Sequence, residues 1–237
     1  MQLLHIKVRQ FLQMLLTEDF RTVFNYAVQR LTIPLFNVHY IFENDLTRAH
    51  ELNDPGRPLP QGFAIRIFRG ENEIGPIADK LRRAGATSAV LTERTKRGDL
   101  VAILFDEEDE VAAYTWATFT DAWMKEVRAT LLLGRDETFG VDTFVLPRWR
   151  GKRLQYILET RKFRHLSDHG YRRSLNSVNA LNTRSLKTQA SERKRQVATV
   201  FSVPMLGVVV VRKYFPDVVI RVQKGPRWRR EVPQSSS

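Results

Sequence analysis

The stretch FVLPRWRGKRLQ, residues 144–155, constrains the fold more strongly than any other part of the chain. Its apolar start leads up to Pro147, which lacks an N–H group and cannot continue a central strand. Gly151 then permits a sharp turn, and an amphipathic pattern typical of a helix follows as far as Gly170. The segment therefore predicts a strand that passes through a short turn directly into a helix.

The same turn is crowded with positive charge, carried by Arg148, Arg150, Lys152 and Arg153. The first N–H groups of a helix have no partner within the helix and lie at the positive end of its dipole. An anion is the natural occupant of such a turn. A solvated cationic turn is the alternative that the charge cluster alone leaves open.

Charge is unevenly distributed along the chain. The formal net charge is +12, but residues 148–237 hold 21 Lys+Arg against 5 Asp+Glu, so the preceding part is slightly acidic. Such a field attracts nucleic acid, anionic lipid, a phosphorylated cofactor or an acidic protein. The sequence has no cysteine, which excludes disulfides, thiolate metal sites and a cysteine nucleophile.

No run reaches the roughly 18 apolar residues of a membrane span. The longest, residues 197–211, is β-branched and interrupted by Pro204 and Gly207, which predicts two buried strands joined by a turn. No small-residue cleavage site follows the apolar N-terminus, so we expect a cytoplasmic protein without a secretory signal.

Three regions are predicted. Residues 1–60 are expected to form an amphipathic helical arm and a linker, with the main boundary in the loop rich in proline and glycine at residues 53–62. The arm either packs on the domain or contacts a membrane surface or partner helix. Residues 61–215 are expected to form the domain, and residues 216–237 a basic strand and tail, partly disordered.

Strands and helices follow one another within the domain. Two apolar runs joined by an acidic turn, residues 100–105 and 111–119, predict a hairpin. Further strands are predicted at residues 63–68, 138–146, 172–180 and 197–211, and helices at residues 77–85, 150–170 and 182–195. This order predicts an α/β or α+β fold, a sheet with helices on its faces. Trp116 and Trp123 are predicted to lie in the core, and Trp149 to pack either beneath the anion site of the turn or against a bound acyl donor.

Two motifs together resemble the GCN5-related N-acetyltransferase (GNAT) superfamily. Val145-Leu146-Pro147 and Arg150-Gly151-Lys152 are similar to its V-x-P step and to the start of its R-G-x-G-x-G/A turn. A later strand ends in Val178, followed by Asn182 and Ser185, as in its V-x-x-x-N-x-x-A/S motif. In that family the turn cradles the pyrophosphate of coenzyme A, and the asparagine lies beside the pantetheine arm. The resemblance covers about residues 63–211.

The resemblance implies a mixed, mostly antiparallel central sheet flanked by helices, and an acyltransferase. Its donor would be acetyl-CoA, a longer acyl-CoA or an acyl carrier protein, and its acceptor an amine on a peptide, sugar or lipid precursor. The basic C-terminal part and the arm favour an acidic carrier or a membrane-associated acceptor. The residues implied in donor binding are Phe144, Val145, Leu146, Arg150, Gly151, Lys152, Arg153, Leu154, Asn182 and Ser185.

Three positions depart from the family pattern. Arg153 replaces the second glycine of the turn, and Gln155 replaces a glycine or alanine. Either Arg153 substitutes a charge-assisted contact for a backbone contact, or the donor is presented differently, as on a carrier protein. Gln189 occupies the place of a tyrosine that protonates the departing thiolate. Glutamine is no general acid, so another group or water acts instead, or transfer proceeds without an acid.

Asp142 is the candidate general base. It lies three residues before Val145, where the family often has an acidic residue, and a carboxylate there would deprotonate an attacking ammonium group. A surface aspartate paired with an arginine is the alternative. Asp136 and Glu137 are weaker candidates because the strand only begins there.

His165 and His169 have the spacing of a zinc-binding pair, but no third ligand is evident, and polar side chains suit the last turn of a helix. We therefore expect no metal. Two other functions remain open: a catalytically silent binding module with the same fold, and, less favoured, nucleic-acid binding through the basic part that contains Arg227, Arg229 and Arg230.

Overall fold

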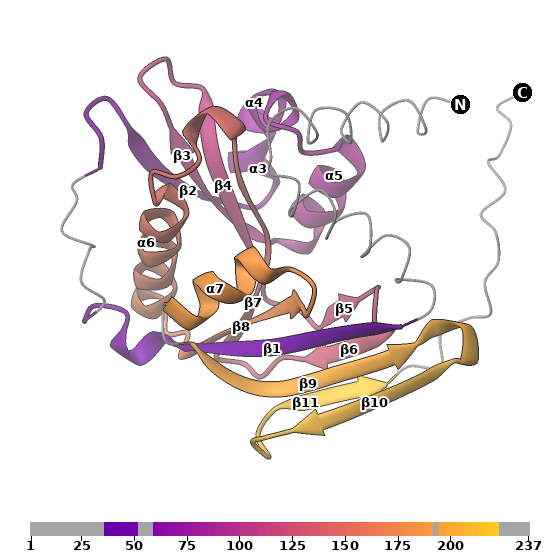
Figure 1. Ribbon diagram of the computed structural model, residues 1–237. Helices are drawn as coiled ribbons and strands as arrows, with labels where there is room; N and C mark the ends of the chain where they lie inside the picture. Colours follow the sequence, from indigo (N-terminus) through magenta and orange to yellow (C-terminus); the bar gives the residue numbers. More distant parts are fainter. Residues whose placement is uncertain (1–35, 52–58, 192–193, 223–237) are drawn as a thin grey trace, which may run out of the picture.

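The computed structural model describes residues 36–51, 59–191 and 194–222 (Figure 1). The helical arm predicted at the start of the chain and the cationic tail with Arg227, Arg229 and Arg230 lie outside these residues. Within the described residues, no helix combines the length and apolar character needed to cross a membrane.

An eight-stranded sheet forms the centre of the protein, in the order β10-β9-β1-β8-β7-β4-β3-β2. Its strands are β1 (Asn37–Asp45), β2 (Ala64–Arg69), β3 (Leu100–Phe105), β4 (Val111–Thr118), β7 (Glu137–Val145), β8 (Arg173–Asn179), β9 (Arg195–Val203) and β10 (Val208–Lys213). All neighbours are antiparallel except β7 and β8. The prediction of a mixed, mostly antiparallel sheet is confirmed, as is the hairpin β3–β4.

Strand β1 lies in the middle of this sheet, where it pairs with both β8 and β9. Its Ile41 is fully buried and packs in one cluster with Leu175 of β8 and Val200 of β9. The prediction that residues 1–60 form a helical arm and linker is therefore wrong for residues 37–45. The β-branched and aromatic residues of this segment favour a strand, and the sheet on both sides supplies its hydrogen bonds.

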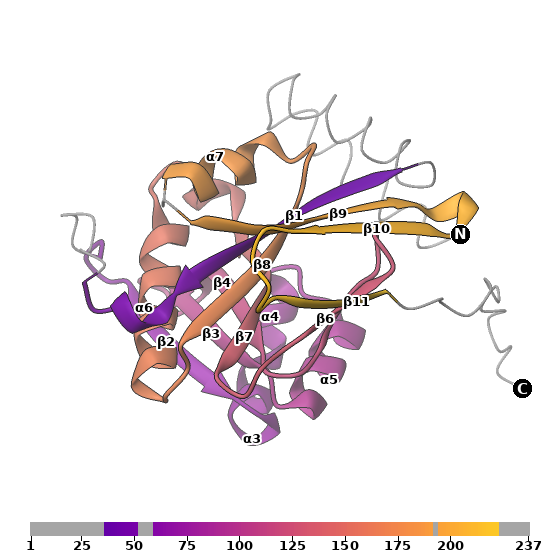
Figure 2. The same cartoon turned by 90° about the horizontal axis from the view of Figure 1, so that it is seen from below.

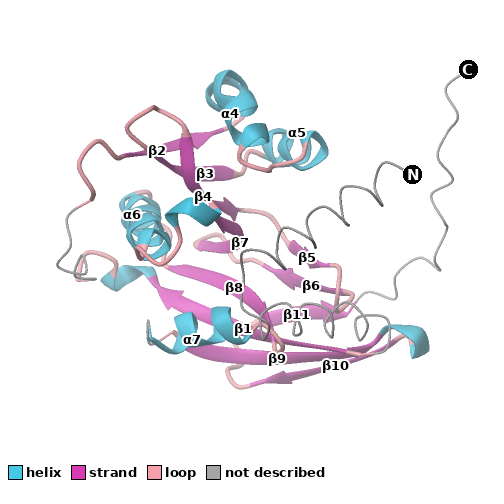
Figure 3. Cartoon of the chain, turned by 45° about the horizontal axis from the view of Figure 1, so that its top comes forward, coloured by secondary structure: helices cyan, strands magenta, loops and turns pink. Residues whose placement is uncertain are grey.

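Helices cover both faces of β2, β3 and β4 (Figure 3). Helices α3 (Glu71–Ile74), α4 (Ala78–Arg83) and α5 (Ser88–Arg97) pack on one face, and α6 (Leu154–Asp168) packs on the other. Along β3, Val101, Ile103 and Phe105 contact the first group, whereas Ala102 and Leu104 contact α6. Side chains alternate along a strand, so a strand that is apolar throughout indicates a sheet covered on both faces.

Helix α5 was not predicted, although its start carries a recognisable signal. Thr87 accepts a hydrogen bond from the N–H of Val90 at 3.4 Å, and Gly98 ends the helix with φ 72°. The predicted helix at residues 77–85 is confirmed as α4, and the predicted helix at residues 182–195 corresponds to α7 (Thr183–Ser191).

A second, three-stranded sheet was not predicted, although one of its strands is the strand expected within residues 216–237 (Figure 2). It consists of β5 (Ala122–Met124), β6 (Ala129–Leu132) and β11 (Val219–Val222), in the order β11-β6-β5. It packs in the same cluster as the inner residues of β1, β8 and β9. Trp116 is buried as predicted, but Trp123 is 47% exposed. On β5 the side chains of Ala122 and Met124 face the core, so that of Trp123 faces outward.

The prediction of two strands around Pro204 and Gly207 is confirmed by β9 and β10. The expectation that both are buried is wrong for β10. It is an edge strand, and its Val208 and Val210 are exposed while Val209 and Val211 pack inward.

Candidate active site

Strands β7 and β8 pair at one end only. Their parallel register runs from Glu137 and Arg173 to Gly140 and Asn176, although β7 continues to Val145 and every residue of both strands is described. Beyond this last pair the strands separate, and we call the space between them the β7–β8 opening. Its cause is a bulge in β7, which bends a strand away from its partner.

The bulge lies at Asp142, whose φ of 42° is left-handed. The register of β7 against β4 shifts at this point, between the pairs Trp116 with Val141 and Tyr114 with Phe144. Consequently Asp142 and Thr143 project from opposite faces of the sheet: Asp142 forms an ion pair with Arg94 of α5, and Thr143 donates to Glu159 of α6 at 3.4 Å.

The predicted strand–turn–helix is present at the wide end of this opening. Strand β7 ends at Val145, a short 3-10 turn covers Pro147–Trp149, and α6 starts at Leu154. Within the described part of the chain, the N–H groups of residues 151–155 donate to no protein acceptor, and no side chain caps the helix. These N–H groups and the helix dipole make the turn a site for an anion.

Each of three cationic side chains of the turn makes a different contact. Arg148 donates to the buried carboxylate of Asp106 at 2.9 Å, which ties the turn to the β3–β4 hairpin. Arg150 donates from Nε to the carbonyl of Val145 at 3.2 Å. The ammonium of Lys152 lies 4.5 Å from the centre of the Trp149 ring. Trp149 in turn packs edge to face on Phe63, at 4.9 Å between ring centres.

Backbone conformation explains the glycines of the family pattern. Gly151 has φ 79°, and Arg153, where the second glycine is expected, has φ 58°. The left-handed region costs a residue with a side chain about 1–2 kcal/mol, whereas glycine adopts it freely. Arg153 thus keeps the conformation of the turn at an energetic cost and adds a charge at the helix start.

Asp142, the predicted base, has a side chain that is 60% exposed, on the same face of the sheet as α5. Its partner Arg94 is only 11% exposed and also lies 5.1 Å from the Trp116 ring centre. Burial raises the pKa of the nearby Tyr114 hydroxyl and Asp142 raises it further, while Arg94 lowers it. The weaker candidate Glu137 is engaged elsewhere, because it pairs with Arg173 and accepts the N–H of Gly134.

A buried polar network lies at the closed end of the opening, on the other face. The ammonium of Lys162, 2% exposed, donates to the hydroxyl of Thr115 at 2.9 Å. Thr115 is in turn hydrogen-bonded to Thr143, and Glu159 accepts from Lys194 at 3.0 Å. Burial acts to raise the pKa of Glu159, but Lys194 and Lys162 outweigh it and lower the pKa below its ordinary value.

Lys162 reaches the last paired residues of β7 and β8. A Cβ atom placed on Gly140 would lie 3.9 Å from Lys162 Nζ and 3.7 Å from the Cβ of Asn176. Sequence reasoning missed Lys162, Glu159 and Lys194 because single charged residues within an amphipathic pattern resemble its solvent face.

Helix α7 borders the same network. The side chain of Asn182 accepts the N–H of Ser185 at 3.0 Å, so this asparagine caps the helix as predicted. Gln189, which replaces the family's tyrosine, is buried and accepts from Asn176 at 3.3 Å. Gln189 therefore connects α7 to the last paired residue of β8.

His165 and His169 stack their rings at 4.1 Å between centres at the far end of α6. No three potential metal ligands gather anywhere among the described residues.

No protein-family model and no curated protein matches the sequence. Solved structures do match it. A tandem GNAT protein from the clavulanic acid biosynthesis pathway superimposes with a TM-score of 0.51 at 14% identity, over 71% of this chain and 54% of that one. The chain has the fold of the GCN5-related N-acetyltransferases.

Two other GNAT proteins match less well. One is a GCN5-related N-acetyltransferase from Sphaerobacter thermophilus, with a TM-score of 0.49 at 12% identity over 81% of this chain and 57% of that one. The other is a putative acetyltransferase of the GNAT family from Novosphingobium aromaticivorans, with 0.47 at 14% identity over 76% and 66%. The chain spans little more than half the length of the tandem and Sphaerobacter proteins.

Proposed function

We propose that the protein is an N-acyltransferase that moves an acyl group from a thioester donor, acyl-CoA or an acylated carrier protein, to an amine. The observation that carries this proposal is the separation of β7 from β8 beside a helix start whose N–H groups have no protein acceptor among the described residues. A thioester of coenzyme A or of a carrier protein needs such an arrangement. Its phosphates require hydrogen-bond donors from the protein, and its extended arm requires a path to the reaction centre.

The turn at residues 146–153 would hold the phosphates of the donor. The N–H groups of residues 151–155, which have no acceptor among the described residues, supply hydrogen bonds, and Arg150, Lys152 and Arg153 supply charge. Helix α6 begins at Leu154, and the positive end of its dipole also attracts the phosphates. The arm of the donor would then pass between β7 and α7, bordered by Asn182 and Ser185.

One backbone amide is oriented to stabilise the oxyanion. The N–H of Leu146 donates to the carbonyl of Ala112 on β4 at 3.0 Å. Because amides alternate in direction along a strand, the N–H of Phe144 also faces β4, and that of Val145 faces the β7–β8 opening. We assign to Val145 the donor that stabilises the charge that develops on the thioester oxygen.

Asp142 would act as the base. It lies on the face of the sheet opposite α6, so the amine would approach from the α5 face. The carboxylate takes a proton from the ammonium form of the acceptor, and the amine nitrogen then forms the C–N bond.

Lys162 would take the role for which Gln189 is unsuited. Its ammonium donates to Thr115, whose hydroxyl is bonded to that of Thr143, two residues before Val145. It therefore approaches, from the α6 face, the part of β7 where the sulfur of a donor held at Val145 would lie. As the C–S bond breaks, Lys162 protonates the departing thiolate, and the second proton lost by the nitrogen restores the ammonium. In balance, an amine and a thioester give an amide and a thiol.

Thiol release tests the proposal. Purified protein is mixed with acyl-CoA donors of increasing chain length, or with acylated carrier protein, and with peptide, aminosugar and aminolipid acceptors. We expect amine-dependent release of free thiol with at least one pair. Donor binding measured by calorimetry without thiol release from any pair would identify a binding module of the same fold, and absence of both binding and release would refute the proposal.

A further inference from the structure

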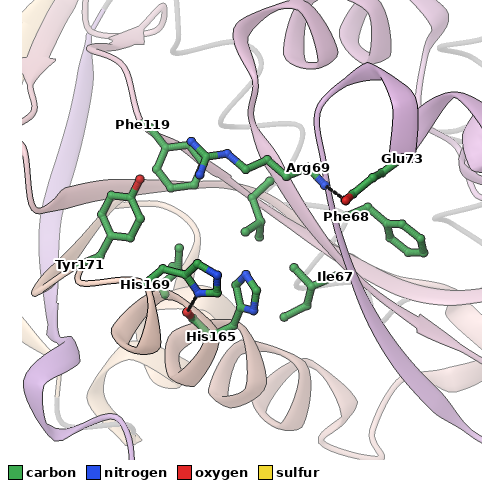
Figure 4. A pocket seen from close by; sticks show the side chains of 10 residues that line it. Ile67, Phe68, Arg69, Glu73, Phe119, His165, His169 and Tyr171 are labelled. Carbon is green, nitrogen blue, oxygen red and sulfur yellow. Dashed lines mark hydrogen bonds between the residues drawn. The ribbon is translucent and has the colours of Figure 1, made fainter.

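A pocket of about 250 Å³ opens at the other end of α6 from the cationic turn (Figure 4). Apolar and aromatic side chains form most of its wall, and four polar residues join them. The lining residues are Ile67, Phe68, Arg69, Glu73, Leu100, Phe119, His165, Leu166, His169 and Tyr171. His165 follows Leu154 by 11 residues, so the pocket lies about 16 Å along the helix from the proposed phosphate site.

The arginine of the pocket is held in place with its terminal groups available. Arg69 stacks on Phe119 at 4.0 Å from Cζ to the ring centre, and its Nε donates to the carbonyl of Gly98 at 3.2 Å. Within the part of the chain that the structure describes, its two terminal amino groups donate to no protein acceptor. Figure 4 shows the guanidinium in front of the Phe119 ring, with Tyr171 beside that ring.

Two imidazoles complete the polar wall. His169 Nδ1 lies 2.7 Å from the carbonyl of His165, and because a carbonyl only accepts, this nitrogen carries the proton. Its Nε2 and both ring nitrogens of His165 form no hydrogen bond with the described residues. Burial, with help from His169, lowers the pKa of His165, which favours the neutral form of its ring.

The charges favour a ligand with a single negative charge. Among the described residues, Glu73 is the one carboxylate of the lining, and it accepts the backbone N–H of Arg69 at 2.6 Å. One guanidinium against one carboxylate gives the lining little excess charge, which disfavours a phosphate dianion. A planar apolar body fits the walls of Phe119, Tyr171 and Leu166.

We propose that this pocket is a second ligand site, which binds a small aromatic monocarboxylate. The carboxylate accepts from the terminal amino groups of Arg69 and from the ring N–H of His165, and the ring packs against Phe119 and Tyr171. Paired hydrogen bonds from one guanidinium to a carboxylate give geometric specificity as well as affinity. Acyl transfer forms no part of this inference, which therefore stands or falls separately from the proposed function.

Benzoate is the probe, and benzamide is its uncharged analogue. Titration into the full-length protein is followed through the imidazole resonances of His165 and His169 by NMR. We expect saturable shifts of both rings with benzoate in the millimolar range, and at least roughly tenfold weaker binding of benzamide and of inorganic phosphate. Absence of shifts with benzoate, or equal binding of benzamide, would overturn the proposal.

A matched pair of variants locates the carboxylate. Arg69→Gln should weaken benzoate binding by roughly tenfold or more. Arg66→Gln is the control, because Arg66 lies on the same strand, stacks on Phe105 at 4.8 Å and lines no part of the pocket. Equal loss in both variants, or none in Arg69→Gln, would also overturn the proposal. If Arg69→Gln does not fold, Arg69→Lys replaces it, and the wild-type titration decides in any case.

Discussion

The ammonium of Lys162 donates to the hydroxyl of Thr115 across 2.9 Å, and both side chains are buried. Taking an ammonium group out of water costs several kcal/mol unless it is hydrogen-bonded and paired. A chain of contacts provides this here, since Thr115 bonds to Thr143 and Thr143 to Glu159. The network joins β4, β7 and α6 where β7 and β8 begin to separate.

Replacing Lys162 tests its assignment as the acid. Lys162→Met keeps the unbranched shape of the side chain, shorter by one atom, and removes the proton donor, so we expect kcat to fall by roughly 10²–10⁴ with little change in donor affinity. Aryl thioesters, whose thiolates leave without protonation, should lose far less activity than acyl-CoA. The measurement is kcat against the pKa of the leaving thiol.

A surface lysine is the control for this experiment. Lys96→Met removes an exposed ammonium on α5 and should leave kcat unchanged. If Lys162→Met slows aryl and alkyl thioesters equally, the lysine has a structural role and the assignment as an acid is wrong.

Arg153 can be separated into its conformation and its charge. Arg153→Gly and Arg153→Ala both remove the guanidinium, but only glycine is at ease at φ 58°. We expect the glycine variant to be more stable than the alanine variant by about 1 kcal/mol in urea unfolding. Both should lose the same factor in donor affinity. A more stable alanine variant would contradict the left-handed conformation of this residue.

Asp142 offers a test of the base. Asp142→Asn should lower kcat by roughly 10²-fold or more, since the amide accepts no proton. Folding stability should change by less than about 1 kcal/mol, because the carboxylate is 60% exposed and the amide oxygen that replaces it can still accept a hydrogen bond from Arg94. Asp79→Asn is the matched control, as Asp79 is an exposed aspartate paired with Arg82. Full activity in Asp142→Asn would show that Asp142 is not the base and that it only pairs with Arg94.

The sequence was sufficient for the parts of the fold that depend on local pattern. Pro147, Gly151 and the pattern that follows them specify a strand, a turn and a helix, and the structure has all three. Strand β1 was missed because its place depends on β8 and β9, which follow more than a hundred residues later. No local signal shows that a short apolar segment near a helical pattern will enter the middle of a sheet.

The candidate site, like the fold, could be predicted from the sequence only where it depends on local pattern. The turn could be predicted because backbone conformation dictates its residue types. The network of Lys162, Glu159 and Lys194 could not, because Lys194 is 35 residues from Glu159 and Thr115 is 47 residues from Lys162, and these partners meet only when α6 packs on the sheet. From the sequence, Arg153 differs from the glycine expected at its position. In the structure its side chain differs, but its backbone has the left-handed conformation that glycine adopts freely.

The ionisation of Glu159 makes stability depend on pH in a definite direction. The pKa of this buried carboxyl lies below its ordinary 4.5 because Lys194 and Lys162 outweigh the effect of burial. A group whose pKa is depressed by folding stabilises the protein fully above its unfolded pKa, and this stabilisation is lost as the pH falls through the folded pKa. The free energy of unfolding from urea titrations below pH 4.5 should therefore fall more steeply in the wild type than in Glu159→Gln.

Lys194→Met should reverse that dependence. Removal of one partner of a buried ion pair costs about 3–5 kcal/mol at neutral pH, because the remaining carboxylate loses much of its compensation. The pKa of Glu159 then rises towards the value that burial favours, so acidification protonates it and relieves part of the destabilisation. Glu93→Gln, which removes an exposed carboxylate paired with Arg97, serves as the control and should retain the wild-type slope. Equal slopes in the wild type, Glu159→Gln and Lys194→Met would show that Glu159 does not ionise within this network.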